Sequence, residues 1–187
     1  MNMIKNLSDE ELVKSIQKNE NPEVCFNELV ERYKEKIFTL IYNYIKNYGS
    51  QDDAEELLLQ TFTKLWFSIP KFKFKSSVYT YLYRIAINLC INFSKQKKQK
   101  NISVEEFQDF FVENKVEEKD TEIENLLKSA IDTLPETQKT AFILAYYQKH
   151  SYAEISKIMN KSISSVESIL FRAKQNLRKI LSKHLIL

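Results

Sequence analysis

The chain has 187 residues, of which 43% are hydrophobic, and its net charge is +3. This length allows one large or two small domains, and the hydrophobic content is sufficient for packed cores. The single glycine, Gly49, and only three prolines argue against a sheet-rich fold and against a glycine-rich phosphate-binding loop. The composition therefore favours an all-α fold and removes the main sequence signature of most nucleotide-binding enzymes.

Nothing in the composition indicates a metal, a cofactor or a membrane span. Cys25 and Cys90 lie far apart in apolar helical surroundings, so each is expected to be a reduced core residue. His150 and His184 have no acids or nucleophiles at an interpretable spacing, which argues against an enzyme, and we expect both at the surface at helix ends. No apolar run approaches the length of a membrane span, so we expect a cytoplasmic protein.

Three helices are predicted in the first 70 residues. Leu7–Leu12 combines a hydrophobic staple with a capping box, so a helix should begin at Asp9. A second helix carries an apolar stripe from Leu29 to Ile45 and should end near Gly49. A third should begin near Asp52 and stop before Pro70. The acids in its first turn complement the helix dipole by roughly 0.3 to 1 kcal/mol each, which explains them without any partner.

The segment from 71 to 100 is basic and contains no acid, which makes it a candidate phosphate-binding surface. The helix within it has an apolar stripe that should face the core. The opposite face carries Tyr81, Arg84, Asn88 and Asn92. Amide groups match base edges and aromatic rings match base faces, so this face suits unpaired bases, as does the preceding loop of Phe and Lys residues. A solvated helix face after a basic loop explains the same pattern.

The charge reverses from Asn101 to Asn125, where nine acids stand against two lysines. Charge of this density opposes compaction, so we expect an acidic linker over residues 101–125. The linker would separate one helical domain over residues 1–100 from a second over residues 126–187.

The second domain contains two predicted helices joined by a tight turn, within Ser151 to Arg178. Apolar residues recur at helical spacing from Tyr152 to Ile158 and again from Ile163 to Leu177. Asn160 stands where the chain must reverse, and after glycine, asparagine best tolerates the left-handed conformation that such a turn needs.

The start of the second helix has two candidate caps. Ser162 can cap it directly, although Ser164 with Glu167 offers a rival capping box. In either case the pattern is that of a helix-turn-helix, whose second helix lies in the major groove of DNA and reads base edges. An ordinary helical hairpin would show the same periodicity.

Taken together, these segments resemble the sigma-70 family of bacterial RNA polymerase sigma factors, of the extracytoplasmic-function type, which keep only the second and fourth sigma domains. The resemblance covers nearly the whole chain. DDAEELLLQTFTKLWF resembles the helix that binds the polymerase clamp, and SSVYTYLYRIAINLCINF resembles the segment that reads the minus-10 element. LPETQKTAFILAYYQKHSYAEISKIMNKSISSVESILFRAKQNLR resembles the fourth domain.

The resemblance implies an all-α protein with sigma region 2 over residues 1–100 and sigma region 4 over residues 126–187. It would bring core RNA polymerase to promoter DNA without chemistry of its own, and without a cofactor or small-molecule substrate. Contacts to the β′ clamp helices of the core would fall on Asp53, Glu55, Glu56 and Gln60. Contacts to the minus-10 single strand would fall on Phe72, Lys73, Lys75, Tyr81, Arg84, Asn88 and Asn92. Contacts to the minus-35 duplex would fall on Lys161, Ser164, Ser165, Glu167, Ser168 and Arg172.

The resemblance further implies that Asn88 and Asn92 line a pocket for a flipped-out base. It also implies two further partners, the β flap of the core polymerase and an anti-sigma factor encoded elsewhere. No membrane insertion is expected. The chain departs from the family where Leu59 and Gln60 replace Gln and then Glu, and where Tyr81 replaces a common Trp. Glu167 stands where basic residues are frequent, so the isolated C-terminal domain should bind DNA weakly.

Two alternatives remain at this point. A helix-turn-helix repressor or activator would leave the polar face from Tyr81 to Asn92 and the acidic helix start at 52–56 unexplained. A helical adaptor that binds only proteins would not depend on Asn88.

Overall fold

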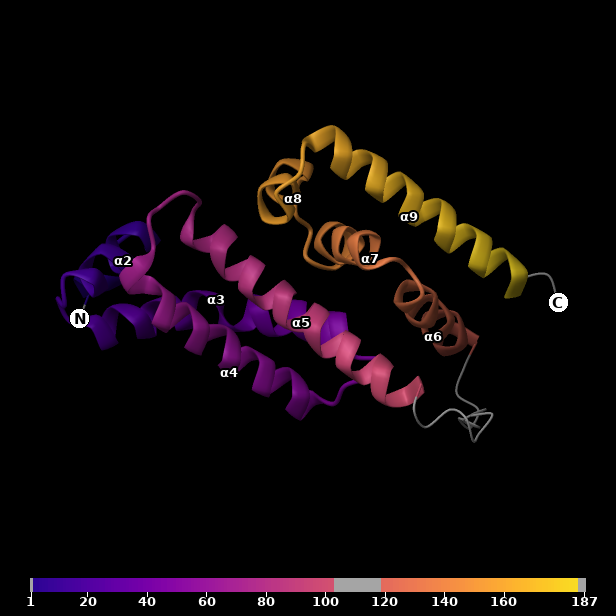
Figure 1. Cartoon of the computed structure of the whole chain (residues 1–187), viewed down its shortest axis with the longest axis horizontal. Helices are drawn as coiled ribbons and strands as arrows, with labels where there is room; N and C mark the ends of the chain where they lie inside the picture. Colours follow the sequence, from indigo (N-terminus) through magenta and orange to yellow (C-terminus); the bar gives the residue numbers. More distant parts are fainter. Residues whose placement is uncertain (1, 103–118, 185–187) are drawn as a thin grey trace.

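The computed structural model describes residues 2–102 and 119–184, which are almost entirely helical, with no strand among them (Figure 1). The N-terminal half contains α1 (Asn2–Lys5), α2 (Asp9–Gln17), α3 (Pro22–Ile45), α4 (Gln51–Ser68), the short η1 (Ile69–Lys71) and α5 (Val78–Ile102). The C-terminal half contains α6 (Lys119–Asp132), α7 (Glu136–Phe142), the π-helical turn η3 (Ile143–Tyr147), α8 (Tyr152–Met159) and α9 (Ile163–His184). The all-α prediction is confirmed.

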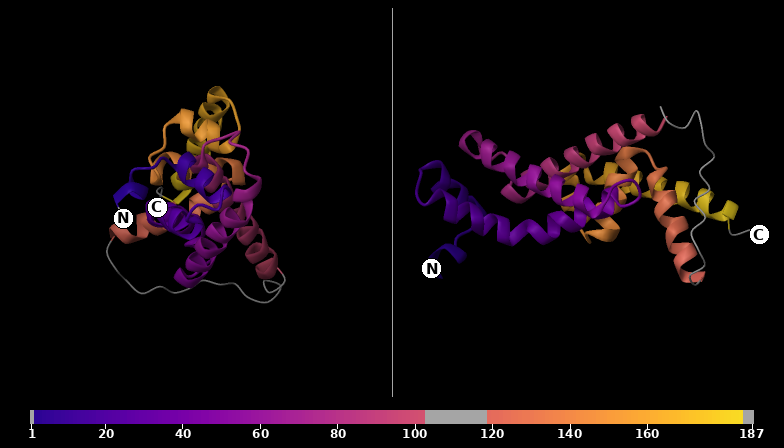
Figure 2. Two further views of the ribbon diagram at one scale, coloured as in Figure 1. Left: turned by 90° about the vertical axis from the view of Figure 1, so that its left-hand side faces the viewer. Right: turned by 90° about the horizontal axis from the view of Figure 1, so that it is seen from below.

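The N-terminal half is built around three long helices, α3, α4 and α5, with α2 packed across one end of α3 (Figures 1 and 2). The predicted stripe of α3 is buried along most of its length, as are Leu65 of α4 and Leu82 of α5. Gly49 lies where α3 turns back into α4. A Cβ atom there would approach Ile45 Cδ1 to 2.9 Å and Phe93 Cε1 to 3.1 Å, so glycine lets this turn pack against α5.

Capping chemistry sets the starts of α2 and α4. The side chain of Ser8 accepts from the Glu11 N–H and the Glu11 carboxylate accepts from the Ser8 N–H, so α2 begins at Asp9 as predicted. The same reciprocal box joins Ser50 to Asp53 and starts α4 at Gln51, one residue before the predicted position.

The C-terminal half is a smaller group of helices in which α9 packs against α6, α7 and α8. Ala173 and Leu177 of α9 pack with Ala130 and Ile131 of α6 in a small separate core. Residues 103–118 of the predicted linker lie outside the described residues, and α6 begins at Lys119, within the range predicted as linker.

The two halves are packed against each other, with α5 against α8 and α3 against η3 (Figures 1 and 2). Their contact is part of one continuous core, because Leu144 and Ile155 from the C-terminal half join the cluster that contains Leu82. Cys25 and Cys90 are buried free thiols, which confirms that prediction.

The prediction for His150 was wrong. His150 is only 8% exposed, because its ring packs against the adjoining rings of Tyr79 and Tyr83 of α5, with ring centres 5.8 and 4.9 Å away. Its Nε2 atom bonds to the Tyr79 hydroxyl, while its buried Nδ1 atom has no hydrogen-bond partner among the described residues. Burial lowers the pKa of His150. The side chain of His184 lies outside the described set.

Candidate functional site

The helices α8 and α9 form the predicted helix-turn-helix. Asn160 closes α8 with φ 52° and ψ 51°, which is the left-handed conformation predicted for it. The Ser156 hydroxyl donates to the carbonyl of Lys161 at 2.6 Å, so a small side chain stabilises the turn. At the other end of α8, Ser151 and Glu154 form a capping box, which lowers the pKa of Glu154 because its carboxylate accepts from Ser151. Both ends of the short helix are therefore fixed by local hydrogen bonds.

The start of α9 is capped by Ser162, which resolves the choice between the two candidate caps. The N–H of Ser165 donates to the Ser162 hydroxyl oxygen at 3.2 Å, and Ser164 shares a hydrogen bond with the same hydroxyl at 3.1 Å. Ser165 is half-buried, and its backbone N–H is engaged in the cap. The other residues predicted to read the minus-35 duplex are exposed, namely Lys161, Ser164, Glu167, Ser168 and Arg172.

Sequence reasoning missed an exposed aromatic residue on α9. Val166, Leu170 and Leu177 are buried, and Phe171 falls outside that stripe and is 62% exposed. At helical spacing, Phe171 shares the outward side of α9 with Ser164 and Ser168. The signal was present in the sequence, as an apolar residue that the amphipathic pattern of α9 leaves without a core position.

The basic loop before α5 is a packed structure. Gln17 of α2 reaches across to it, and its Nε2 atom donates to the carbonyls of Ile69 at 2.8 Å and Phe72 at 2.9 Å. The ring of Phe72 lies 5.0 Å from that of Phe74 and 5.1 Å from that of Tyr81. Phe72 and Tyr81 are half-buried in this cluster, while Lys73 and Lys75 are exposed beside it.

The polar face of α5 does not act as one continuous surface. Asn88 and Asn92 are exposed, whereas Arg84 is half-buried and points to the C-terminal half of the molecule. Its Nη2 and Nε atoms donate to the carbonyls of Lys157 at 2.6 Å and Ile158 at 3.0 Å, which are in the last turn of α8. Arg84 and Asn88 both line a cavity of about 360 Å³ between α5, α7 and α8.

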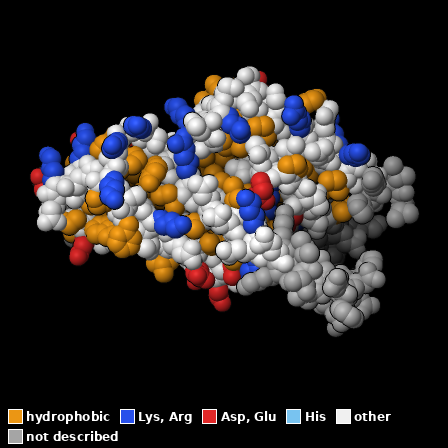
Figure 3. All heavy atoms as spheres, viewed as in Figure 1, with side chains coloured by type: hydrophobic (Ala, Val, Ile, Leu, Met, Phe, Trp, Pro, Cys, Tyr) orange, Lys and Arg blue, Asp and Glu red, His pale blue; other side chains and the backbone are white. Residues whose placement is uncertain are grey.

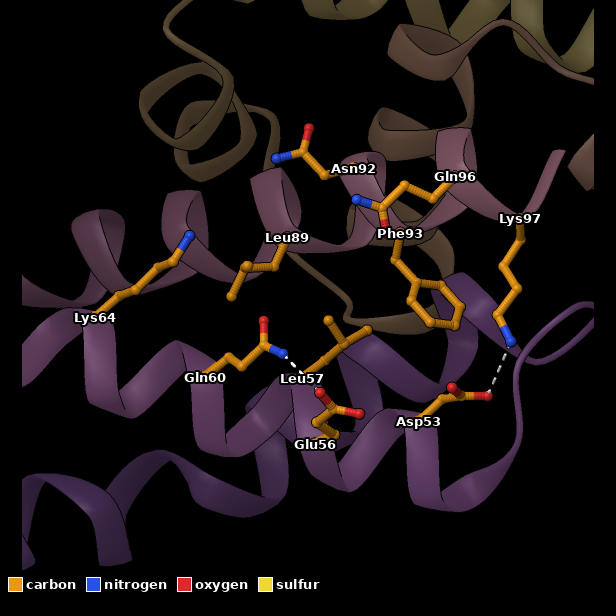
Figure 4. Close-up of a pocket in the computed structure, with 10 residues that line it drawn as sticks. All are labelled: Asp53, Glu56, Leu57, Gln60, Lys64, Leu89, Asn92, Phe93, Gln96 and Lys97. Atoms are coloured by element: carbon orange, nitrogen blue, oxygen red, sulfur yellow. Dashed lines mark hydrogen bonds and ion pairs between the residues drawn. The ribbon is translucent and has the colours of Figure 1, made fainter. Parts of the chain in front are cut away.

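Asn92 lines a different cavity, of about 480 Å³, between α4 and α5 (Figure 4). Its lining includes Gln60 and Lys64 of α4 and Asn92 and Gln96 of α5. Asn88 and Asn92, exposed one helical turn apart on α5, thus line two different cavities.

The residues predicted to bind the polymerase core lie along α4. Glu55 and Glu56 are exposed, and Gln60 donates to Glu56 at 3.0 Å. The Asp53 carboxylate accepts from the Ser50 N–H, which lowers the pKa of Asp53, and lies 3.7 Å from Lys97 Nζ (Figure 4). Asp53 is thus engaged in capping, while the two glutamates face solvent.

The same helix also carries exposed apolar side chains. Leu59 and Phe67 of α4 are 69% and 74% exposed. A mainly apolar cavity of about 430 Å³ between α3 and α4 is lined by Phe26, Leu59 and Trp66, among others. These residues indicate that α4 presents both charge and hydrophobic surface to a partner.

Charge is unevenly spread over the face in Figure 3. Lys and Arg side chains are scattered across it, whereas acidic side chains gather at its lower edge, over the N-terminal end of α4. Within the described residues, no group of three or more His, Cys, Asp or Glu side chains is placed to hold a metal ion. No helix in the same residues has both the length and the hydropathy to cross a membrane.

Two family models match the chain. The model described as Sigma-70 region 2 matches residues 29–100, and the model described as Sigma-70, region 4 matches residues 124–177. The chain is 31% identical to the ECF RNA polymerase sigma-E factor of Haemophilus influenzae, with 92% of this chain and 95% of the relative covered. It is 28% identical to the sigma-E factor of Escherichia coli K12, with 92% and 94% covered.

Two solved structures share the fold. CnrH, solved in complex with the cytosolic domain of CnrY, has a TM-score of 0.66 at 16% identity, covering 94% of this chain and 97% of that chain. RpoE from Bartonella quintana, solved with the anti-sigma factor NepR, has a TM-score of 0.55 at 20% identity, covering 84% and 96%.

Proposed function

The chain belongs to the sigma-70 family, as an RNA polymerase sigma factor of the extracytoplasmic-function type, and we propose how its surfaces divide the work of initiation. It directs transcription initiation. The observation that carries the proposed division is that base-matching side chains project from two separate helices, α5 and α9. A protein that reads one promoter element as a single strand and another as a duplex needs two separate reading surfaces, and these two helices can provide them.

We propose that α9 reads the minus-35 duplex in the major groove. Ser164 and Ser168 offer hydroxyls to base edges, and Arg172 can pair with guanine or with phosphate. Phe171 adds an exposed ring that suits contact with a thymine methyl group. Lys161, at the turn, is placed to bind backbone phosphate.

We propose that α5 and the preceding loop read the minus-10 single strand. Asn88 and Asn92 present unburied carboxamides for base edges. Lys73 and Lys75 are exposed for the phosphates that flank those bases. Flipping a base out of the duplex costs a few kcal/mol, so binding of unpaired bases favours sites where unpairing is easy.

The proposed core-binding surface is α4, with Glu55, Glu56 and the exposed Leu59 at its centre and Gln60 at its edge. Charged groups around an apolar patch are typical of a specific protein interface. The β flap of the core polymerase and an anti-sigma factor are further proposed partners, the latter because the sigma factor RpoE of Bartonella quintana, which shares this fold, was solved with the anti-sigma factor NepR.

The chain is proposed to act without catalysing a reaction and to work in the cytoplasm, where core polymerase is found. The two alternative functions lose their support. A simple helix-turn-helix regulator does not explain the match to region 2, and a protein-only adaptor does not explain the match to region 4.

The test is an Asn88→Ala variant. Asn27→Ala is the matched control, because Asn27 is an exposed asparagine on α3, a helix that carries none of the residues proposed to read DNA. Promoter opening by the reconstituted holoenzyme is followed by permanganate reactivity of unpaired thymines, and core binding by co-migration on a sizing column. We expect Asn88→Ala to lose opening while core binding is retained, and the control to behave as wild type. Normal opening by Asn88→Ala would contradict the proposal.

A further inference from the structure

A lysine of region 4 is held between two tyrosines of region 2. Lys139 of α7 is only 1% exposed, and its Nζ atom lies 4.7 Å from the ring centre of Tyr44 and 4.8 Å from that of Tyr48. The ammonium group donates to the Tyr48 hydroxyl at 2.9 Å and to the carboxylate of Asp132. A buried charge is stable only when it is paired and hydrogen-bonded, and a desolvated cation gains from aromatic faces. The aromatic rings and one of the hydrogen-bond acceptors that stabilise the buried charge of Lys139 therefore come from region 2.

The polar groups around this lysine are also matched across the contact. The Tyr44 hydroxyl donates to Glu136 at 2.9 Å and shares a hydrogen bond with Thr140 at 3.0 Å. Burial raises the pKa of Tyr44, so its hydroxyl keeps the proton that it donates. Asn47, just beyond α3, donates to the carbonyl of Lys128 at 2.9 Å and to Asp132. Hydrogen bonding of the buried polar groups on both sides is typical of a specific interface between two domains.

A second contact covers part of the proposed minus-10 face. Arg84 caps the last carbonyls of α8, which have no partners within their own helix. Tyr83 is 1% exposed in this contact, and His150 packs against it. Asn88 lines the cavity that the contact leaves between the two regions. In this arrangement the Arg84 guanidinium is taken up by carbonyls of α8, while Asn88 stays exposed at the edge of the contact.

We propose that Tyr44 and Tyr48 form a docking site for Lys139, and that the docked chain is a latched state in which region 4 covers part of the minus-10 face. Reading of the minus-10 strand then requires the latch to open. The docking stands on the contacts alone, whereas its consequence for DNA rests on the proposed function of α5.

Two variants of the full chain test the docking. Lys139→Met keeps the length of the side chain and removes the charge. The double variant Tyr44→Phe and Tyr48→Phe keeps both rings, removes both hydroxyls and leaves region 4 unaltered. Lys18→Met is the control, because Lys18 is exposed beyond α2, away from the contact.

The readout is the radius of gyration from small-angle X-ray scattering, with far-UV circular dichroism to establish that each variant is folded. We expect the wild type and the control to be compact. The double tyrosine variant should be expanded, because it loses hydrogen bonds to the charged groups of Lys139 and Glu136. Its ratio of open to closed forms should rise about 10-fold or more. Lys139→Met should expand likewise. An extended wild type, or a folded double variant as compact as wild type, would overturn the latch.

A second measurement separates the latch from the proposed function. Fluorescence anisotropy follows binding of a fluorescein-labelled single-stranded DNA of randomised sequence at low salt. If region 4 covers the reading face, the opened variants bind about 5- to 10-fold tighter than wild type. Expansion without any gain in DNA affinity would overturn the covering of α5 while leaving the docking of Lys139 in place.

Discussion

The turn of the helix-turn-helix depends on one residue, Asn160, and its substitution gives a sharp test. Its backbone is left-handed, a conformation that costs an ordinary L-residue roughly 1 to 2 kcal/mol and asparagine less. The side chain is exposed, so truncation removes no packing. Asn160→Ala should therefore destabilise the protein by about 0.5 to 1 kcal/mol, while Asn160→Gly should leave stability unchanged or slightly raised.

Urea unfolding followed by far-UV circular dichroism measures this difference. With a slope of about 1 to 3 kcal/mol per molar urea, a loss of 1 kcal/mol lowers the midpoint by about 0.3 to 1 M. Lys161→Ala is the control, because the neighbouring lysine is also exposed and should change the free energy of unfolding by less than about 0.5 kcal/mol. An alanine variant at position 160 that is at least as stable as the glycine variant would contradict the conformational cost assigned to this turn.

The pKa of His150 is lower in the folded protein than in the unfolded chain, so on acidification the unfolded chain binds a proton at a higher pH than the folded protein does. The free energy of unfolding should therefore fall as the pH drops below about 6.5. His150→Gln should remove this pH dependence from urea titrations. Arg172→Ala should reduce the slope of log affinity against log salt for promoter duplex by about one, and an unchanged slope would exclude a phosphate contact. Phe171→Ala should weaken specific promoter binding about 10-fold and change the free energy of unfolding by less than about 0.5 kcal/mol, so equal losses in both would indicate a structural role.

Elements fixed by local chemistry could be predicted from the sequence. The capping box at Ser8 sets the start of α2, and Asn160 takes the left-handed turn predicted for it. Each depends on residues within a few positions along the chain. The choice of Ser162 over Ser164 as the cap of α9 could not be made, because both caps satisfy the same local rule.

Features that depend on distant partners could not be predicted. His150 is buried by Tyr79, which is 71 positions away, and no periodicity links them. Arg84 fits the pattern of a base-reading stripe, yet carbonyls of α8 take up its guanidinium. A lysine such as Lys139 is expected at the surface, and only the folded structure places Tyr48 beside it. The packing of the two regions against each other is what the sequence pattern does not contain.

The exposed apolar residues were missed for a different reason. Phe67 and Phe171 fall outside the core stripes of their helices, and a search for stripes passes over such residues. An apolar residue left over from an amphipathic pattern is itself a signal of an interaction surface.

The central claim is tested most directly by run-off transcription with purified core RNA polymerase, genomic DNA fragments and this protein. We expect defined transcripts that appear only when the protein is added and that start at a fixed distance from a shared pair of upstream elements. The Asn88→Ala variant should lose these transcripts, whereas the Asn27→Ala control should retain them. Transcripts that do not depend on the protein, or no specific initiation from any fragment, would contradict the account.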